Sequence, residues 1–194
     1  MWHYRLSHTL PTHPMSKNVL IISSSARRGG NSDTLCDQYA AGARDAGHNV
    51  EKIRLAEKEI GFCRGCYVCE KTGSCIQQDD MPALIEKLKA ADVIVLASPV
   101  YFYTICARLK NFIDRTVAIY PYKGFAGKVW QFIITAAEDE APAMQHALGD
   151  FQGFMECMEE PVIKAPIMGL GAWNMGDIRS NPAMQAAYAA GKEC

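Results

Sequence analysis

The sequence lacks both a long apolar run and a strong excess of charge of either sign. No segment approaches the roughly 20 consecutive apolar residues of a membrane-spanning helix, so we expect no membrane segment. Its 20 lysines and arginines stand against 21 aspartates and glutamates, and the basic residues are scattered along the chain. Because an anionic polymer would find no continuous basic track, we expect no nucleic-acid binding. The expected partners are small molecules or other proteins.

The first fourteen residues lack the continuous apolar stretch of a signal peptide. They contain three histidines and two prolines, and the spacing of the histidines matches no metal-ligand motif, which favours a disordered tail over a metal site. A strand-like run begins shortly after Met15. We therefore expect a disordered N-terminal extension over residues 1–14 and a single domain over residues 15–194. Cysteine-rich chains without an export signal are typical of a reducing compartment, so we expect a cytoplasmic location.

Apolar, β-branched runs alternate with segments of helical periodicity along the rest of the chain. Strands are predicted at 18–23, 50–55, 92–97, 127–135 and 161–168, and helices at 31–46, 82–91, 104–117, 141–158 and 181–191. Such alternation requires parallel strands joined by right-handed crossovers. The sequence therefore predicts an α/β fold, with a doubly wound five-stranded parallel sheet and helices on both faces.

A loop rich in serine and glycine joins the first predicted strand to the first predicted helix, over Ser23–Ser32. It offers hydroxyls, unhindered N–H groups, a positive helix end and the charge of Arg27 to a phosphate. The loop matches neither the dinucleotide fingerprint nor the nucleotide-triphosphate loop, so a single phosphate is the expected ligand. The alternative is an ordinary turn in which Asn31 or Ser32 caps the helix.

Two further loops are expected at the same edge of the sheet. The third strand is followed by a proline-fixed bend with the aromatic residues Tyr101, Phe102 and Tyr103, which suit contact with a flat conjugated ring. The fourth strand ends at Thr135-Ala-Ala137, where small residues allow close approach of backbone groups. Core packing of the three aromatic side chains is the alternative. Together the loops predict a pocket at the switch point of the sheet.

Four of the eight cysteines form a C-x2-C-x2-C-x5-C array at Cys63, Cys66, Cys69 and Cys75. This spacing favours a 4Fe-4S cluster, because one tight loop can direct several thiolates inward. Structural zinc is a weaker interpretation, since it usually joins two separated pairs of ligands. Free or reversibly oxidised thiols are a third. The isolated Cys36, Cys106 and Cys157 fall in predicted helices and are expected to be small core residues.

With these motifs placed, the chain after Met15 resembles the NADPH-dependent FMN reductase-like flavoproteins and, within them, the iron-sulfur flavoproteins. The resemblance rests on the phosphate loop, the cysteine array running into Asp79-Asp-Met81, the Ser98-Pro-Val-Tyr-Phe102 bend and Leu109-Lys-Asn-Phe-Ile-Asp-Arg115. It implies a flavodoxin-like fold with strand order 2-1-3-4-5. It also implies assembly as a homodimer or homotetramer.

The resemblance implies FMN at the carboxyl ends of the strands. The phosphate would lie among Ser25, Arg27, Asn31, Ser32 and Asp33, with Ser23 also in the cofactor site, and the ring would lie along Pro99, Val100, Tyr101 and Phe102 with Thr135 and Ala136 nearby. In iron-sulfur members, Cys63, Cys66, Cys69 and Cys75 would ligate a 4Fe-4S cluster that passes electrons to FMN. Such chemistry belongs to the cofactor, so no catalytic residue is predicted.

The leading hypothesis is an FMN-dependent oxidoreductase. Its donor would be NAD(P)H or ferredoxin, and its acceptor a quinone, a free flavin or an aromatic compound. The alternative is a non-enzymatic electron carrier that exchanges electrons with ferredoxin-like partners. A thiol or zinc sensor without flavin is a third interpretation.

Overall fold

The computed structural model describes residues 16–120 and 124–194. The predicted extension over residues 1–14 lies outside them, and the single domain over residues 15–194 stays a prediction. The strands are β1 (Asn18–Ser23), β2 (Asn49–Arg54), β3 (Val93–Tyr101), β4 (Thr104–Ile105), β5 (Val129–Thr135), β6 (Val162–Ile163) and β7 (Ile167–Gly169). They form one sheet in the order β2-β1-β3-β5-β6, in which every neighbouring pair is parallel.

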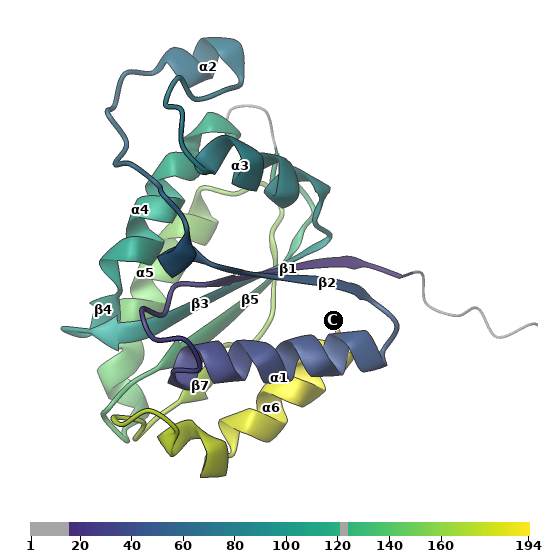
Figure 1. Cartoon of the computed structure of the whole chain (residues 1–194), viewed down its shortest axis with the longest axis vertical. Coiled ribbons are helices and arrows are strands. Elements are labelled where there is room, and N and C mark those ends of the chain that lie inside the picture. Colours follow the sequence, from purple (N-terminus) through teal and green to yellow (C-terminus); the bar gives the residue numbers. More distant parts are fainter. Residues whose placement is uncertain (1–15, 121–123) are drawn as a thin grey trace, which may run out of the picture.

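Helices cover both faces of this sheet. The α-helices are α1 (Asn31–Asp45), α2 (Val68–Thr72), α3 (Met81–Ala90), α4 (Ala107–Arg115), α5 (Gln145–Glu156) and α6 (Ala183–Lys192), and short 3-10 helices include η1 (Leu55–Glu57), η2 (Thr116–Ala118), η4 (Ala141–Met144) and η5 (Asp177–Ser180). Helices α1 and α6 lie on one side of the sheet, and α3, α4 and α5 lie on the other (Figure 1). Within the described ranges, no helix has the length and apolar character needed to cross a membrane.

The inner strand β1 is buried on both faces because its apolar residues alternate between two cores. Leu20 and Ile22 belong to the core beneath α3, α4 and α5, whereas Val19 and Ile21 belong to the core beneath α1 and α6. A run without polar interruption is typical of such a doubly covered parallel strand. The predicted flavodoxin-like fold and its strand order are therefore confirmed, with the predicted fourth and fifth strands corresponding to β5 and to β6 with β7.

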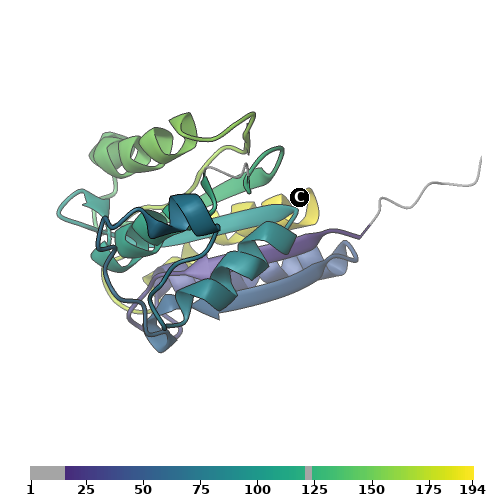
Figure 2. The same cartoon turned by 90° about the horizontal axis from the view of Figure 1, so that it is seen from above.

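Two predicted elements differ from the structure, and one short helix was not predicted. The fifth strand is divided into β6 and β7, which both pair with β5, and Pro166 between them has no N–H to donate to a ladder. The predicted helix from Thr104 begins only at Ala107, because Thr104 and Ile105 pair antiparallel with the end of β3. The cysteine segment contains the short helix α2, which projects beyond the sheet (Figure 1) and lies in front of it when seen from above (Figure 2).

Helices α1 and α6 pack with their backbones almost in contact. A Cβ atom added at Gly42 would lie 2.0 Å from the carbonyl oxygen of Tyr188, and one added at Gly191 would lie 2.1 Å from that of Tyr39. Neither obstacle is a flexible side chain, so the helices themselves would have to separate. Both glycines are thus required by the close approach of the two helices.

We expect Gly191→Ala to lower the free energy of unfolding by about 2–3 kcal/mol, because it overpacks this crossing. Gly153→Ala is the matched control, since Gly153 lies exposed in α5 with no atom within 4 Å of the added Cβ. There the change to a better helix former is expected to stabilise the chain by about 0.5–1 kcal/mol. Urea unfolding of both variants tests the packing, and equal effects would contradict it.

Candidate functional site

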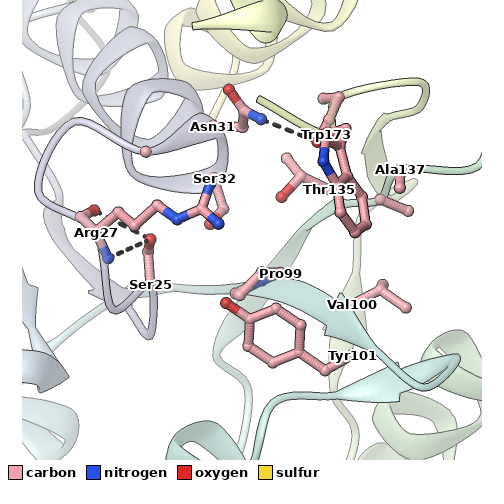
Figure 3. A pocket seen from close by; sticks show the side chains of 13 residues that line it. Ser25, Arg27, Asn31, Ser32, Pro99, Val100, Tyr101, Thr135, Ala137 and Trp173 are labelled. Carbon is pink, nitrogen blue, oxygen red and sulfur yellow. Dashed lines mark hydrogen bonds between the residues drawn. The ribbon is translucent and has the colours of Figure 1, made fainter. Parts of the chain in front are cut away.

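The main candidate site is a cleft at the carboxyl ends of β1, β3 and β5 (Figure 3). Its lining comprises Ser25, Arg27, Gly30, Asn31 and Ser32 from the first loop, Pro99, Val100 and Tyr101 from β3, Thr135, Ala136 and Ala137 after β5, and Ala172 and Trp173 after β7. In a sheet of this order, the connections after β1 and β3 leave toward opposite faces. The cleft therefore lies at the switch point that the sequence predicts.

The loop after β1 is held in a tight turn by its own hydrogen bonds. The Ser25 hydroxyl donates to the carbonyl oxygen of Arg27 at 3.1 Å and accepts from the N–H of Arg27 at 3.2 Å. Gly29 has a φ of +65°, a conformation that favours glycine. At Gly30, a Cβ atom would lie 3.0 Å from the Ser25 hydroxyl and from the Cβ of Arg27, so it would crowd the inside of the turn.

Unpaired polar groups meet at the start of α1. Gly30 precedes the helix without any side-chain cap among the described residues, which leaves the first N–H groups open to another acceptor. The Ser32 hydroxyl is buried and has no hydrogen-bond partner in the described part of the chain. Donors of this kind at a helix N-terminus, beside Arg27, suit a phosphate group. The residues present therefore fit the phosphate of a mononucleotide.

Ser23 and Asp33 lie beneath the loop rather than in the lining of the cleft. The Asp33 carboxylate accepts from the Ser23 hydroxyl at 2.8 Å and from the N–H of Gly29 at 2.9 Å. It also forms ion pairs with Lys52 and Arg54 of β2. These contacts fix the backbone of the loop, and the two cations offset a carboxylate that would otherwise repel a phosphate.

Burial by itself would raise the pKa of the Asp33 carboxyl. The donors Gly29 and Ser23 and the charge of Lys52 outweigh that effect, and the pKa lies below the ordinary 3.8. A carboxyl whose pKa is lowered on folding stabilises the folded state above its unfolded pKa of about 3.9. That contribution is lost as the pH falls through the lower, folded value.

We expect Asp33→Asn to lower the free energy of unfolding by about 3 kcal/mol at neutral pH, because it removes the buried carboxylate that pairs with both Arg54 and Lys52. The difference from the wild type should shrink below about pH 4, where the wild-type carboxyl also becomes protonated. The control is Asp37→Asn, which removes a more exposed partner of Lys52 and should cost less than about 1 kcal/mol. Urea unfolding between pH 7 and pH 3 measures both, and a difference independent of pH would contradict this assignment.

The bend predicted after β3, which was expected to contact a flat ring, is a hairpin. Val100 pairs with Ile105 and Tyr101 with Thr104, so Phe102 and Tyr103 occupy the turn with φ values of 50° and 67°. Turns with two positive φ values usually carry Asn-Gly. Tyr101 lines the cleft, whereas the Phe102 side chain is 99% exposed and lies outside the lining.

Trp173 and Ala172 line the cleft but were not among the predicted site residues. Both follow β7, whose carboxyl end lies at the same edge of the sheet as those of β1, β3 and β5. The position of this segment directly after the predicted fifth strand could therefore have identified it as part of the site. Asn31 lines the cleft, and its side chain donates a hydrogen bond to the backbone of this segment (Figure 3). Its predicted place beside the phosphate stays a prediction.

The four clustered cysteines line a second hollow, together with residues of α4 and η2. Cys63 and Cys66 are exposed, Cys69 is buried and Cys75 is intermediate, and all four are free thiols. Burial raises the pKa of the Cys69 thiol, and the charges of Cys75, Cys63 and Cys66 add to that effect. Across the described residues, no group of three or more potential ligands is arranged to hold a metal ion. The array thus shares one hollow without showing a coordination geometry.

A buried cation adjoins these thiols. The Arg115 guanidinium donates to the Cys75 sulfur at 3.4 Å, to an Asp79 carboxylate oxygen at 2.6 Å and to the carbonyl oxygen of Gly61 at 2.7 Å. Burial lowers the pKa of Arg115, but the bond to Asp79 outweighs it and the net shift is upward. Arg115 thus places a buried positive charge beside one sulfur of the cysteine hollow.

The sheet order, the helical layers and the cleft at the switch point define a flavodoxin-like α/β protein. Residues 17–171 match the family model for NADPH-dependent FMN reductase, and the chain belongs to this family. An iron-sulfur flavoprotein of Archaeoglobus fulgidus is 38% identical over 94 residues, covering 48% of this chain and 43% of that protein. One from Methanocaldococcus jannaschii is 40% identical over 98 residues, covering 50% and 51%. The chain thus spans about half the length of these relatives.

Solved structures confirm the fold. An NAD(P)H:quinone oxidoreductase from Methanothermobacter marburgensis superposes with a TM-score of 0.66 at 17% identity, covering 92% of this chain and 96% of that one. A flavodoxin from the domain Archaea superposes with a TM-score of 0.57 at 14% identity, covering 91% and 94%. These likenesses establish the architecture alone.

Proposed function

We propose that the chain is an FMN-dependent oxidoreductase whose cleft between β1 and β3 holds the cofactor. The observation that carries this proposal is the Ser32 hydroxyl, which is buried at the uncapped start of α1 and has no partner among the described residues. A buried polar group without a partner is costly, so its presence at this position favours an external acceptor. The family membership supports FMN as the source of that acceptor.

The residues of the cleft have separable roles in this proposal. Ser25, Arg27 and Ser32 surround the phosphate, while Pro99, Val100 and Tyr101 form one side of the ring site and Thr135 and Ala136 another. When bound, FMN supplies both hydride and single-electron chemistry. The protein orients the ring and holds the phosphate. NAD(P)H or ferredoxin is the proposed donor, and a quinone, a free flavin or an aromatic compound is the proposed acceptor.

We further propose that Cys63, Cys66, Cys69 and Cys75 ligate a 4Fe-4S cluster. Their common hollow and the buried Arg115 beside Cys75 support this assignment. Such a cluster supplies one-electron transfer, and hydrogen bonds to its sulfurs tune its potential. The names of the relatives, iron-sulfur flavoproteins, are consistent with it. Zinc or free thiols are the other outcomes of the test below.

The assembly and the location are proposals as well. We propose a homodimer or homotetramer, because Phe102, Tyr103 and Met175 expose large apolar surfaces outside the lining of the cleft and exposed apolar patches mark interaction sites. We propose the cytoplasm as the location, because all eight cysteines are free thiols in the structure.

We expect Ser32→Ala to weaken FMN binding about 10- to 100-fold, the effect of losing a hydrogen bond to a charged group. Stability without ligand should not fall, because this hydroxyl bonds to nothing in the described structure. Quenching of flavin fluorescence during titration measures the affinity, and urea unfolding measures the stability.

Ser24→Ala is the matched control for that substitution. The Ser24 hydroxyl donates to the carbonyl oxygen of Ala97 at 2.7 Å and does not line the cleft. Its removal should cost about 1 kcal/mol of stability and leave FMN affinity within about twofold. If Ser32→Ala behaved like this control, the phosphate site would have to lie elsewhere.

Anaerobic spectroscopy of the wild-type chain tests the redox proposal. We expect flavin absorption bands, about four irons and four acid-labile sulfides per chain from the cluster stoichiometry, and rapid bleaching of the flavin on addition of NADPH or NADH. Bands that do not bleach would favour the electron carrier over the reductase. Flavin without iron would remove the cluster, and a folded, colourless chain that takes up no FMN would refute the proposed function.

A further inference from the structure

The Asn31 side chain is fully engaged by the segment that carries Trp173. Its Nδ2 donates to the carbonyl oxygens of Ala172 and Asn174, both at 2.9 Å. Its Oδ1 accepts from the N–H of Gly176 at 3.0 Å and faces the N–H of Ile178 at 3.5 Å. We name residues 172–178 the Trp173 loop. Asn31 thus ties the start of α1 to both sides of Trp173.

A second set of bonds holds the same loop to the end of β5. The N–H of Ala172 donates to the carbonyl oxygen of Ala136 at 2.7 Å, and the N–H of Ala136 donates to that of Gly169 at 3.0 Å. Within the loop, the Asp177 carboxylate accepts from the N–H of Asn174 at 2.6 Å. The backbone on either side of Trp173 is therefore fixed by two walls of the cleft.

The Trp173 side chain is nevertheless 72% exposed, although it lines the cleft. Tyr101, at 49% exposure, lines the cleft from β3 on the opposite side (Figure 3). An indole whose backbone is anchored but whose face is uncovered is suited to contact with a planar ring. Flat conjugated groups are the ligands that two such aromatic walls favour.

Asn31 has no free donor for a phosphate. A side-chain amide has two N–H groups, and both are directed to carbonyl oxygens of the Trp173 loop. Donation to a phosphate oxygen would require one of these bonds to break. The uncapped N–H groups of α1, Ser32 and Arg27 supply donors without that cost.

We propose that Trp173 contacts the isoalloxazine ring, and that Asn31 is a positioning residue that holds Trp173 rather than a phosphate ligand. The inference rests on the proposed binding of FMN. Under this proposal, the cleft has a phosphate end at Ser32 and a ring end at Trp173. Asn31 contributes to the ring end through the Trp173 loop, although it precedes Ser32 in the sequence.

The test compares the dissociation constants of FMN and of riboflavin, which has the same ring without the phosphate. Trp173→Ala should weaken both ligands about tenfold, the loss of one aromatic contact, and Trp173→Phe should restore most of that loss. Asn31→Ala should weaken both ligands by a common factor, and Asn31→Ala combined with Trp173→Ala should bind no more weakly than the weaker single variant. Ser32→Ala, the matched control, should weaken FMN and leave riboflavin unchanged.

Each outcome decides the inference. If Asn31→Ala weakened FMN alone, Asn31 would be a phosphate ligand, and if Trp173→Ala changed neither constant, the ring contact would be refuted. Should Asn31→Ala not fold, the milder Asn31→Ser takes its place, and Trp173→Ala and Trp173→Phe still allow the affinities for FMN and riboflavin to be compared. A wild-type chain that binds neither ligand would remove the proposed function and this inference with it, whereas normal wild-type binding with unchanged variants would remove the inference alone.

Discussion

The structure depends on the parallel pairing of β1 with β3 and on the point where that pairing ends. The N–H and the hydroxyl of Ser24 both donate to the carbonyl oxygen of Ala97, which closes the ladder one residue beyond Ser23. From there the chain after β1 enters α1 on one face, whereas the chain after β3 turns through a hairpin into α4 on the other. This divergence opens the cleft and directs the start of α1 into it.

The cleft also requires a particular arrangement of charge. A helix N-terminus with Arg27 beside it attracts an anion, but Asp33 in the same helical turn would oppose this attraction if its charge were uncompensated. Lys52 and Arg54 project from β2 to that carboxylate, and Glu57 in turn pairs with Arg54. The edge strand β2 thus neutralises the charge of Asp33 beneath the loop. The cleft itself keeps the positive charge of Arg27.

The sequence predicted what depends on local pattern, and it failed where distant segments meet. Buried apolar runs identified the main strands, and the serine- and glycine-rich turn identified the loop after β1. The role of Asn31 was beyond reach, because its partners lie more than 140 residues away in a loop that only the finished sheet brings to α1. The hairpin at Phe102 and Tyr103 was missed because its turn lacks the usual Asn-Gly signal.

Helix α4 connects the surroundings of the two hollows. At its start, the N–H of Cys106 donates to the Ser98 hydroxyl and its thiol lies 3.0 Å from the Ser24 hydroxyl, directly beneath the loop after β1. At its end, Arg115 reaches Cys75 and Asp79. A cation there also complements the negative end of the helix dipole. Nine helical residues span about 13–14 Å, so the length of α4 separates the loop after β1 from the thiols, with Arg115 as the link between helix and sulfur.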